Sequence, residues 1–121
     1  MAKTILIADD EPNQVVTLET FLSQRGYHVI AVGDGEQVFP KALEWTPQLI
    51  ILDIMMPKMD GTEVAMVLKR DMRTKHIPIF FVTALISPED QLSTGPIFAK
   101  PVKLSELLEA IQKATADEVV S

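Results

Sequence analysis

The chain has 121 residues and a mass of 13.4 kDa, which is the size of one ordinary globular domain. Apolar residues make up 47% of it, enough for a core, and the absence of cysteine excludes disulfides, thiolate zinc sites and a cysteine nucleophile. Eleven basic and seventeen acidic residues give a formal charge of −6, which argues against nucleic-acid binding because clustered Lys and Arg bind phosphate backbones.

Five short, mostly apolar segments, partly β-branched, recur along the chain. Continuous apolar runs of this length are typical of strands that are buried on both faces of a parallel sheet. The predicted strands are Thr4–Ala8, Tyr27–Val32, Leu49–Leu52, Ile77–Val82 and Ile97–Ala99. His28 interrupts the second run, which favours an edge position for that strand.

Helical patterns lie between these strands. Pro12 suits the first position of a helix, where its missing N–H has no intrahelical partner. Pro40 falls inside the second expected helix, so that helix either starts late or is kinked. Asp60 with Glu63 reads as a capping box for the third helix. Apolar residues recur at helical spacing in three places: Val15, Leu18 and Leu22; Val64, Val67 and Leu68; and Leu104, Leu107, Leu108 and Ile111.

Residues 86–96 leave room for only about two helical turns before the last strand, so the fourth helix is predicted to be short. Ser87 with Asp90 resembles a capping box at its start. Strand and helix alternate five times, which predicts an α/β fold of the (βα)₅ type, a three-layer sandwich with helices on both faces of a parallel five-stranded sheet.

No apolar run approaches the ~18 residues that a membrane-spanning helix needs. The chain passes from Met1 almost directly into Ile5–Ile7 and then acids, so no signal peptide is expected. We therefore expect a cytoplasmic single domain over residues 1–121, with a frayed tail from about residue 115, no output domain and no membrane insertion.

Carboxylates, a hydroxyl and an ammonium are predicted to meet at one edge of the sheet. Ligands of open parallel sheets bind beyond the carboxyl ends of the strands. The first strand is followed there by the acids Asp9, Asp10 and Glu11, and the third by Asp53. Clustered acids repel one another unless a cation joins them, and all-oxygen ligands favour Mg²⁺. The alternative is that the first three acids cap a helix, but a lone Asp53 at a buried strand end needs a partner, which favours the metal site.

Thr83 directly follows the predicted fourth strand, and Lys100 directly follows the fifth. Each alone is uninformative, because threonine is common in strands and most lysines are solvated. Together, a hydroxyl and an ammonium facing a metal-bound carboxylate are suited to phosphoryl transfer. Asp53 would then be the nucleophile that forms an aspartyl phosphate.

These segments, taken in order, resemble the receiver domain of two-component response regulators. The matching segments are Ile5–Glu11, Leu49–Gly61 (which includes Asp53, Pro57 and Asp60), Val82–Ala84 and Lys100–Pro101. The resemblance covers nearly the whole chain, and it implies a flavodoxin-like sheet of order 2-1-3-4-5.

The resemblance also implies roles for individual residues. Asp53 would accept a phosphoryl group from a histidine kinase or a histidine phosphotransfer protein. Asp10 would bind Mg²⁺ directly and Asp9 largely through water, and the backbone carbonyl of Met55 would supply a further ligand. Thr83 would be the switch hydroxyl, with Lys100 as the ion-pair partner of the phosphoryl group.

Two further features follow from the resemblance. Phe98 would be the aromatic residue whose rotamer follows Thr83, and the bond between Lys100 and Pro101 would be cis. The chain departs from the family in one place: Thr83 and Lys100 are 17 positions apart, fewer than is usual, and the missing part is the end of the fourth helix. This departure leaves the chemical residues in place, but it puts a docking mode through the fourth helix in doubt.

The main hypothesis is a stoichiometric signalling switch rather than an enzyme, acting by docking onto a partner or in a phosphorelay. A small aspartate-nucleophile phosphatase would need an Asp-x-Asp pair and usually a cap domain, whereas Asp9 and Asp10 are adjacent. A flavodoxin-like electron carrier would need Ser, Thr and Gly after the first strand to bind its cofactor phosphate, whereas the acids Asp9, Asp10 and Glu11 found there would repel it. A pseudo-receiver that binds partners without phosphate stays open as the alternative.

The other conspicuous side chains have structural interpretations. Met55, Met56 and Met59 are expected to pack within the loop after the third strand. Trp45 is expected to be a partly buried anchor, and His28 to be structural or exposed.

Overall fold

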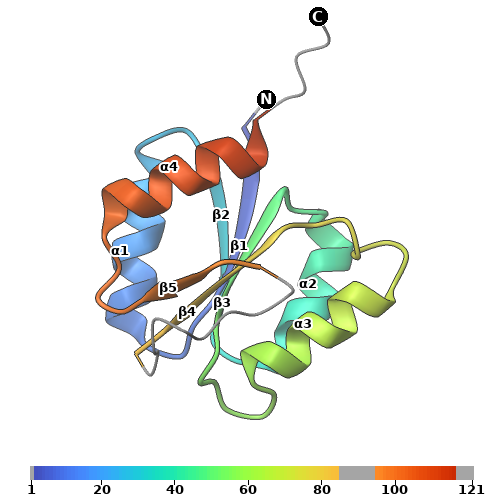
Figure 1. The fold of residues 1–121 in the computed structure, drawn as a ribbon. Helices are drawn as coiled ribbons and strands as arrows, with labels where there is room; N and C mark the ends of the chain where they lie inside the picture. The colour runs from blue at the N-terminus through green and yellow to red at the C-terminus, as the bar shows by residue number, and fades with distance from the viewer. Residues whose placement is uncertain (1, 85–94, 117–121) are drawn as a thin grey trace, which may run out of the picture.

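The computed structural model describes residues 2–84 and 95–116. They form one sheet of five parallel strands in the order β2-β1-β3-β4-β5, with helices on both sides (Figure 1). The elements are β1 (Thr4–Ala8), α1 (Pro12–Ser23), β2 (His28–Val32), the 3₁₀ turn η1 (Gly35–Gln37), α2 (Val38–Trp45), β3 (Leu49–Asp53), α3 (Gly61–Arg70), β4 (Ile79–Thr83), β5 (Ile97–Ala99) and α4 (Leu104–Thr115). The predicted α/β class and strand order are confirmed, and α4 is the fifth of the predicted helices.

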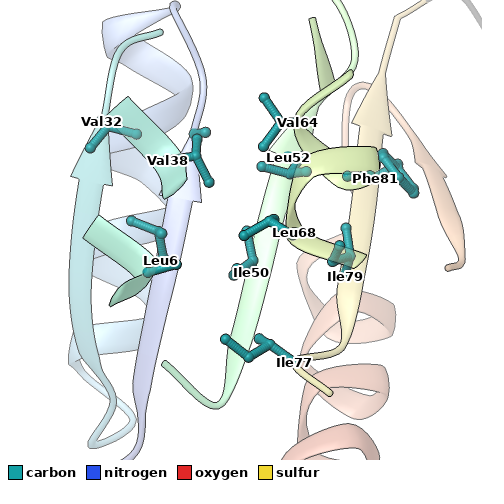
Figure 2. Close-up of a cluster of buried hydrophobic side chains, with 13 residues drawn as sticks. Leu6, Val32, Val38, Ile50, Leu52, Val64, Leu68, Ile77, Ile79 and Phe81 are labelled. Carbon is teal, nitrogen blue, oxygen red and sulfur yellow. The ribbon is translucent and has the colours of Figure 1, made fainter. Parts of the chain in front are cut away.

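The sheet divides the core into two apolar clusters. Helices α1 and α4 cover one face, and α2 and α3 cover the other (Figure 1). Because side chains alternate along a strand, Ile5 and Ile7 of β1 join the α1/α4 cluster, whereas Leu6 joins the α2/α3 cluster. Figure 2 shows the second cluster, in which Leu68 of α3 lies over Ile50 of β3. Every residue of β3 and β4 is buried, which is why their sequences are apolar without alternation.

The helix starts agree with the sequence signals. Pro12 is the first residue of α1, and the Asp60 carboxylate caps α3 by accepting a hydrogen bond of 3.0 Å from the N–H of Glu63. Helix α2 starts late, at Val38 after η1, so Pro40 lies in its first turn, where its missing N–H removes no intrahelical bond. The predicted edge position of β2 is also confirmed.

The strand limits differ slightly from those predicted: β2 begins at His28, β3 extends to Asp53, and β4 spans Ile79–Thr83. The predicted short fourth helix, with Ser87 and Asp90, lies outside the described residues. In the described part of the chain, no helix is both long and apolar enough to cross a membrane.

Candidate functional site

The carboxyl ends of the central strands bring the predicted residues to one edge of the sheet. Asp9 follows β1, Asp53 is the last residue of β3, Thr83 is the last residue of β4, and Lys100 follows β5. The pairing places Asp53 beside Val82 of the neighbouring strand. Parallel register therefore gathers residues that are up to 91 positions apart in the sequence.

The Lys100 ammonium bridges two buried carboxylates. Its Nζ lies 3.0 Å from Oδ2 of Asp9 and 3.1 Å from Oδ2 of Asp53. The two aspartates are only 2% and 4% exposed. Since a buried carboxylate without a counter-charge is costly, Lys100 is the main internal partner of both. The peptide bond that links Lys100 to Pro101 is cis.

Backbone N–H groups fix the other oxygen of each carboxylate. Oδ1 of Asp9 accepts a hydrogen bond of 2.9 Å from the N–H of Glu11, and Oδ1 of Asp53 accepts one of 3.1 Å from the N–H of Met55. The N-terminal cap of α1 is Glu11, whose side chain makes no capping hydrogen bond. The alternative in which these acids serve as helix caps is therefore not supported by the geometry.

The acidic cluster fits a hard divalent cation. Asp9, Asp10 and Asp53 each offer a carboxylate oxygen within 4.8 Å of the others, and Asp10 is exposed to solvent. Within the described residues, Oδ2 of Asp9 is buried and lacks a hydrogen-bond partner, although the Lys100 ammonium lies 3.0 Å away as an ion-pair partner. Oxygen-only donors with open access to water are the set that Mg²⁺ prefers.

Burial shifts the ionisation of both groups in the central ion pair. It raises the pKa of Asp53, and the nearby charge of Asp9 raises it further, although hydrogen bonds from Lys100 and the Met55 N–H oppose both effects; the net shift is upward. Burial lowers the pKa of Lys100, but contacts with Asp9 and Asp53 outweigh it and leave that pKa above its usual value. The lysine is therefore a permanent cation of this edge.

The switch candidates occupy neighbouring strands. Thr83 is 2% exposed, and its backbone carbonyl accepts a hydrogen bond of 2.9 Å from the N–H of Lys100. Phe98 of β5 is partly buried in the α1/α4 cluster, and its ring centroid lies 5.4 Å from that of Phe80. Thr83 and Phe98 thus sit on adjacent hydrogen-bonded strands, one buried and one packed at the sheet edge.

The loop between β3 and α3 approaches the sheet so closely that only glycine fits at its end. A Cβ on Gly61 would lie 2.6 Å from the backbone oxygen of Asp53, and the Gly61 N–H donates to the oxygen of Ile54 at 2.9 Å. Within this loop, Met56 and Met59 pack against the core, as predicted. Met55 does not: it is 57% exposed, because its N–H turns toward Asp53 and leaves its side chain outside.

Sequence reasoning missed a second support of this loop. A Cβ on Gly35 would lie 1.9 Å from the backbone oxygen of Met59, so the turn before α2 presses against the loop. Lys58, whose φ is 68°, places its Nζ 3.7 Å from Oδ2 of Asp34. The two segments are more than twenty positions apart, and the only sequence signal is the Asp34-Gly35 pair.

A family profile described as the response regulator receiver domain matches residues 5–112 of the chain. The chain belongs to this family. Receiver domains are the phosphoryl-accepting parts of two-component signalling systems, so the resemblance found in the sequence is confirmed at the level of the family.

Several curated relatives are response regulators. The chain is 43% identical over 84 residues to the alkaline phosphatase synthesis transcriptional regulatory protein PhoP of Bacillus subtilis, covering 69% of this chain and 34% of that protein. It is 34% identical over 117 residues to the response regulator GtcR of Aneurinibacillus migulanus, covering 93% and 47%. The chain therefore spans less than half the length of these relatives.

Solved structures of receiver domains share the fold. A putative response regulator from Chloroflexus aurantiacus superposes with a TM-score of 0.89 at 25% identity, covering 97% of this chain and 100% of that one. The receiver domain of the sensor histidine kinase PA1611 from Pseudomonas aeruginosa, which has a magnesium ion in its active-site cleft, has a TM-score of 0.87 at 27% identity with the same coverage.

Proposed function

We propose that this receiver domain is a phosphorylatable signalling switch that accepts a phosphoryl group on Asp53 from a phosphohistidine. The observation that carries the proposal is the position of the Lys100 ammonium, 3.0 Å and 3.1 Å from the two buried carboxylates, with Asp10 completing an acidic cluster. A buried carboxylate held beside a fixed cation is an oriented nucleophile.

In the proposed step, a carboxylate oxygen of Asp53 forms a bond to phosphorus while the bond between phosphorus and the donor imidazole breaks. The electron pair of that bond stays on the imidazole nitrogen, which takes up a proton from solvent. The Lys100 ammonium contacts the oxygens on which negative charge accumulates, and the Thr83 hydroxyl donates a hydrogen bond to the same group. The site accepts one group per molecule, so the domain acts stoichiometrically.

Magnesium would be held by the carboxylates of Asp10 and Asp53 and the backbone oxygen of Met55, with Asp9 acting through water. Bound there, it supplies positive charge to the transferring phosphoryl group. The N–H bonds to Asp9 and Asp53 orient these carboxylates before the ion arrives. Phosphorylation would draw Thr83 toward Asp53 and change the space available to Phe98, which alters the surface that partners contact.

A pocket next to the acids supports docking of the phosphoryl donor. It has a volume of about 300 Å³ and lies between α1 and β2, where Asp9 and Asp10 meet the apolar side chains of Val15 and Val16. Val16 is 62% exposed, although it belongs to a helix that covers the core. A histidine kinase or a histidine phosphotransfer protein is the donor proposed for this surface.

Intact-mass spectrometry after incubation with acetyl phosphate and Mg²⁺ tests the proposal. The wild type should gain one phosphoryl group, and Asp53→Asn should gain none while keeping its fold by circular dichroism. Asp71→Asn is the matched control, because Asp71 pairs with Arg73 after α3 and lies outside the acidic cluster, and this variant should be phosphorylated normally. Incorporation that survives in Asp53→Asn would refute the acceptor, and no adduct from either acetyl phosphate or a phosphorylated kinase would favour the phosphorylation-independent pseudo-receiver.

A further inference from the structure

Positive charge is concentrated at the C-terminal end of α3. Residues 69–75 hold four of the eleven basic residues of the chain (Lys69, Arg70, Arg73 and Lys75) and only one acid, Asp71. The remainder of the chain is consequently more acidic than the chain as a whole. Since α3 starts beside Asp53 and runs back along the sheet, this basic segment lies at the opposite edge from the carboxylates (Figure 1).

The turn that follows α3 is held in place by internal hydrogen bonds. The Nζ of Lys69 donates to the backbone oxygens of Lys75 at 3.2 Å and Ile77 at 3.3 Å. The hydroxyl of Thr74, which is 1% exposed, donates to the oxygen of Leu68 at 2.7 Å. The backbone of the turn is therefore fixed before any partner binds, which lowers the entropic cost of binding.

Two large apolar side chains are exposed on α3 and on the turn that follows it. Met72 is 79% exposed and Met66 is 50% exposed. Met66 and Arg70 are four positions apart on α3 and so share one face of the helix. Methionine adapts its shape to different apolar partners and is common at protein-binding surfaces.

The cations of this segment are not equivalent. Arg73 is neutralised by Asp71 through hydrogen bonds of 3.0 Å and 2.9 Å, and its guanidinium lies 6.0 Å from the centre of the Phe39 ring on α2. Arg70 and Lys75 are exposed, and neither forms an ion pair with any carboxylate in the described residues. Two cations and two methionines are thus available to an external ligand.

We propose that Met66, Arg70, Met72 and Lys75, which we call the α3 basic surface, form a docking site for an acidic, amphipathic segment of a partner protein. Charge complementarity selects the acidic partner, and the methionines select one that also carries apolar side chains. An extended polyanion such as DNA is disfavoured, because the acidic remainder of the chain would repel it. The proposal does not depend on phosphorylation of Asp53.

Fluorescence anisotropy with a labelled synthetic amphipathic peptide of Glu and Leu residues tests the α3 basic surface in the unphosphorylated full chain. The wild type should bind this peptide and should not bind a version with Ser in place of Leu or Lys in place of Glu. The double substitution Arg70→Glu with Lys75→Glu should weaken binding at least about 10-fold, and Met66→Ser with Met72→Ser should weaken it several-fold. The matched control is Lys103→Glu, at the residue before α4, with Lys113→Glu on α4; both lysines are exposed, and this variant should bind as the wild type does.

Other outcomes would overturn the proposal. One is the absence of peptide binding up to ~1 mM. Another is an equal weakening of binding in the Lys103→Glu/Lys113→Glu control, which would indicate nonspecific charge attraction. Tighter binding of duplex DNA or of phosphatidylserine vesicles through Arg70 and Lys75 would assign the surface to a different ligand class. Self-association of the wild type in sedimentation, lost in the Arg70→Glu/Lys75→Glu variant, would assign it to a second copy of the chain.

Discussion

The Lys100 ion pairs give the most direct test of how the site affects stability. Replacing Lys100 by Met keeps much of the side-chain volume but removes the cation that lies 3.0 Å from Asp9 and 3.1 Å from Asp53. At an effective dielectric constant near 20, each contact corresponds to roughly 5 kcal/mol of Coulomb energy. Replacing Lys100 also removes the cost of burying its charge, which offsets several kcal/mol of that sum. The net loss of unfolding free energy should therefore be about 3 kcal/mol.

The assay is urea unfolding of the metal-free protein, followed by the fluorescence of Trp45, whose ring centroid lies 5.3 Å from that of His28. Lys103→Met is the matched control, because the Lys103 side chain is 78% exposed, and it should change the free energy of unfolding by less than about 0.5 kcal/mol. A loss below about 1 kcal/mol in Lys100→Met would refute the view that the lysine is the main counter-charge of the buried acids.

The pH dependence of the same variant supplies an independent check. Without the ammonium, the pKa of Asp53, which is already raised, should rise further. A carboxyl group whose pKa is higher in the folded state contributes stability that is present at low pH and is lost as the pH rises through the folded pKa. The stability deficit of Lys100→Met should therefore shrink as the pH falls from about 7 toward about 5, and an equal deficit at both values would contradict the electrostatic explanation.

Three further predictions concern single residues near the site. Asp60→Ala should lower the free energy of unfolding by about 1 kcal/mol, since the carboxylate caps α3. The hydrogen bonds that Asp60 accepts from Thr62 and Glu63 lower its pKa, so urea unfolding should show this deficit above about pH 4 and its loss as the pH falls through the folded pKa. An unchanged deficit at low pH would contradict this explanation. Gly61→Ala should cost about 2 kcal/mol, because the added methyl group would lie 2.6 Å from the Asp53 oxygen; thermal unfolding measures this, and Gly33→Ala, where the space is open, should be nearly neutral. Asp53→Asn should stabilise the metal-free protein at neutral pH, because it removes a buried charge whose pKa is raised in the folded state. The gain in unfolding free energy should become smaller as the pH falls through that raised pKa. An equal gain in urea unfolding at neutral and at acidic pH would be incompatible with the shift.

The residues of the site could be predicted from the sequence because strand ends in a parallel sheet share one edge. Asp9, Asp53, Thr83 and Lys100 each follow or end an apolar run, so their meeting required only the strand assignments. The contact between Lys100 and Asp9 could not be foreseen, because the sequence places Lys100 equally well near several acids.

The loop after β3 was harder to predict, for a physical reason. Positions 55 and 56 are both methionine, so residue type cannot tell which of the two is buried. That depends on the local turn at Asp53. The contact of Gly35 with Met59 joins segments that are distant in sequence and whose residues have no obligatory partner type. Both features arise from backbone geometry, which composition and periodicity do not encode.

The strands of the sheet interior are apolar on both faces, and this leaves their alignment weakly specified by hydrophobicity. If β3 slipped by one residue along its neighbours, apolar side chains would still meet apolar side chains on each face. The slip would, however, move Asp53 either into the apolar interior of the sheet or out of reach of Lys100. The ion pair between Asp53 and Lys100 therefore favours one strand register over its neighbours. The same side chains that are proposed to act in phosphoryl transfer thus also help to specify how the strands align.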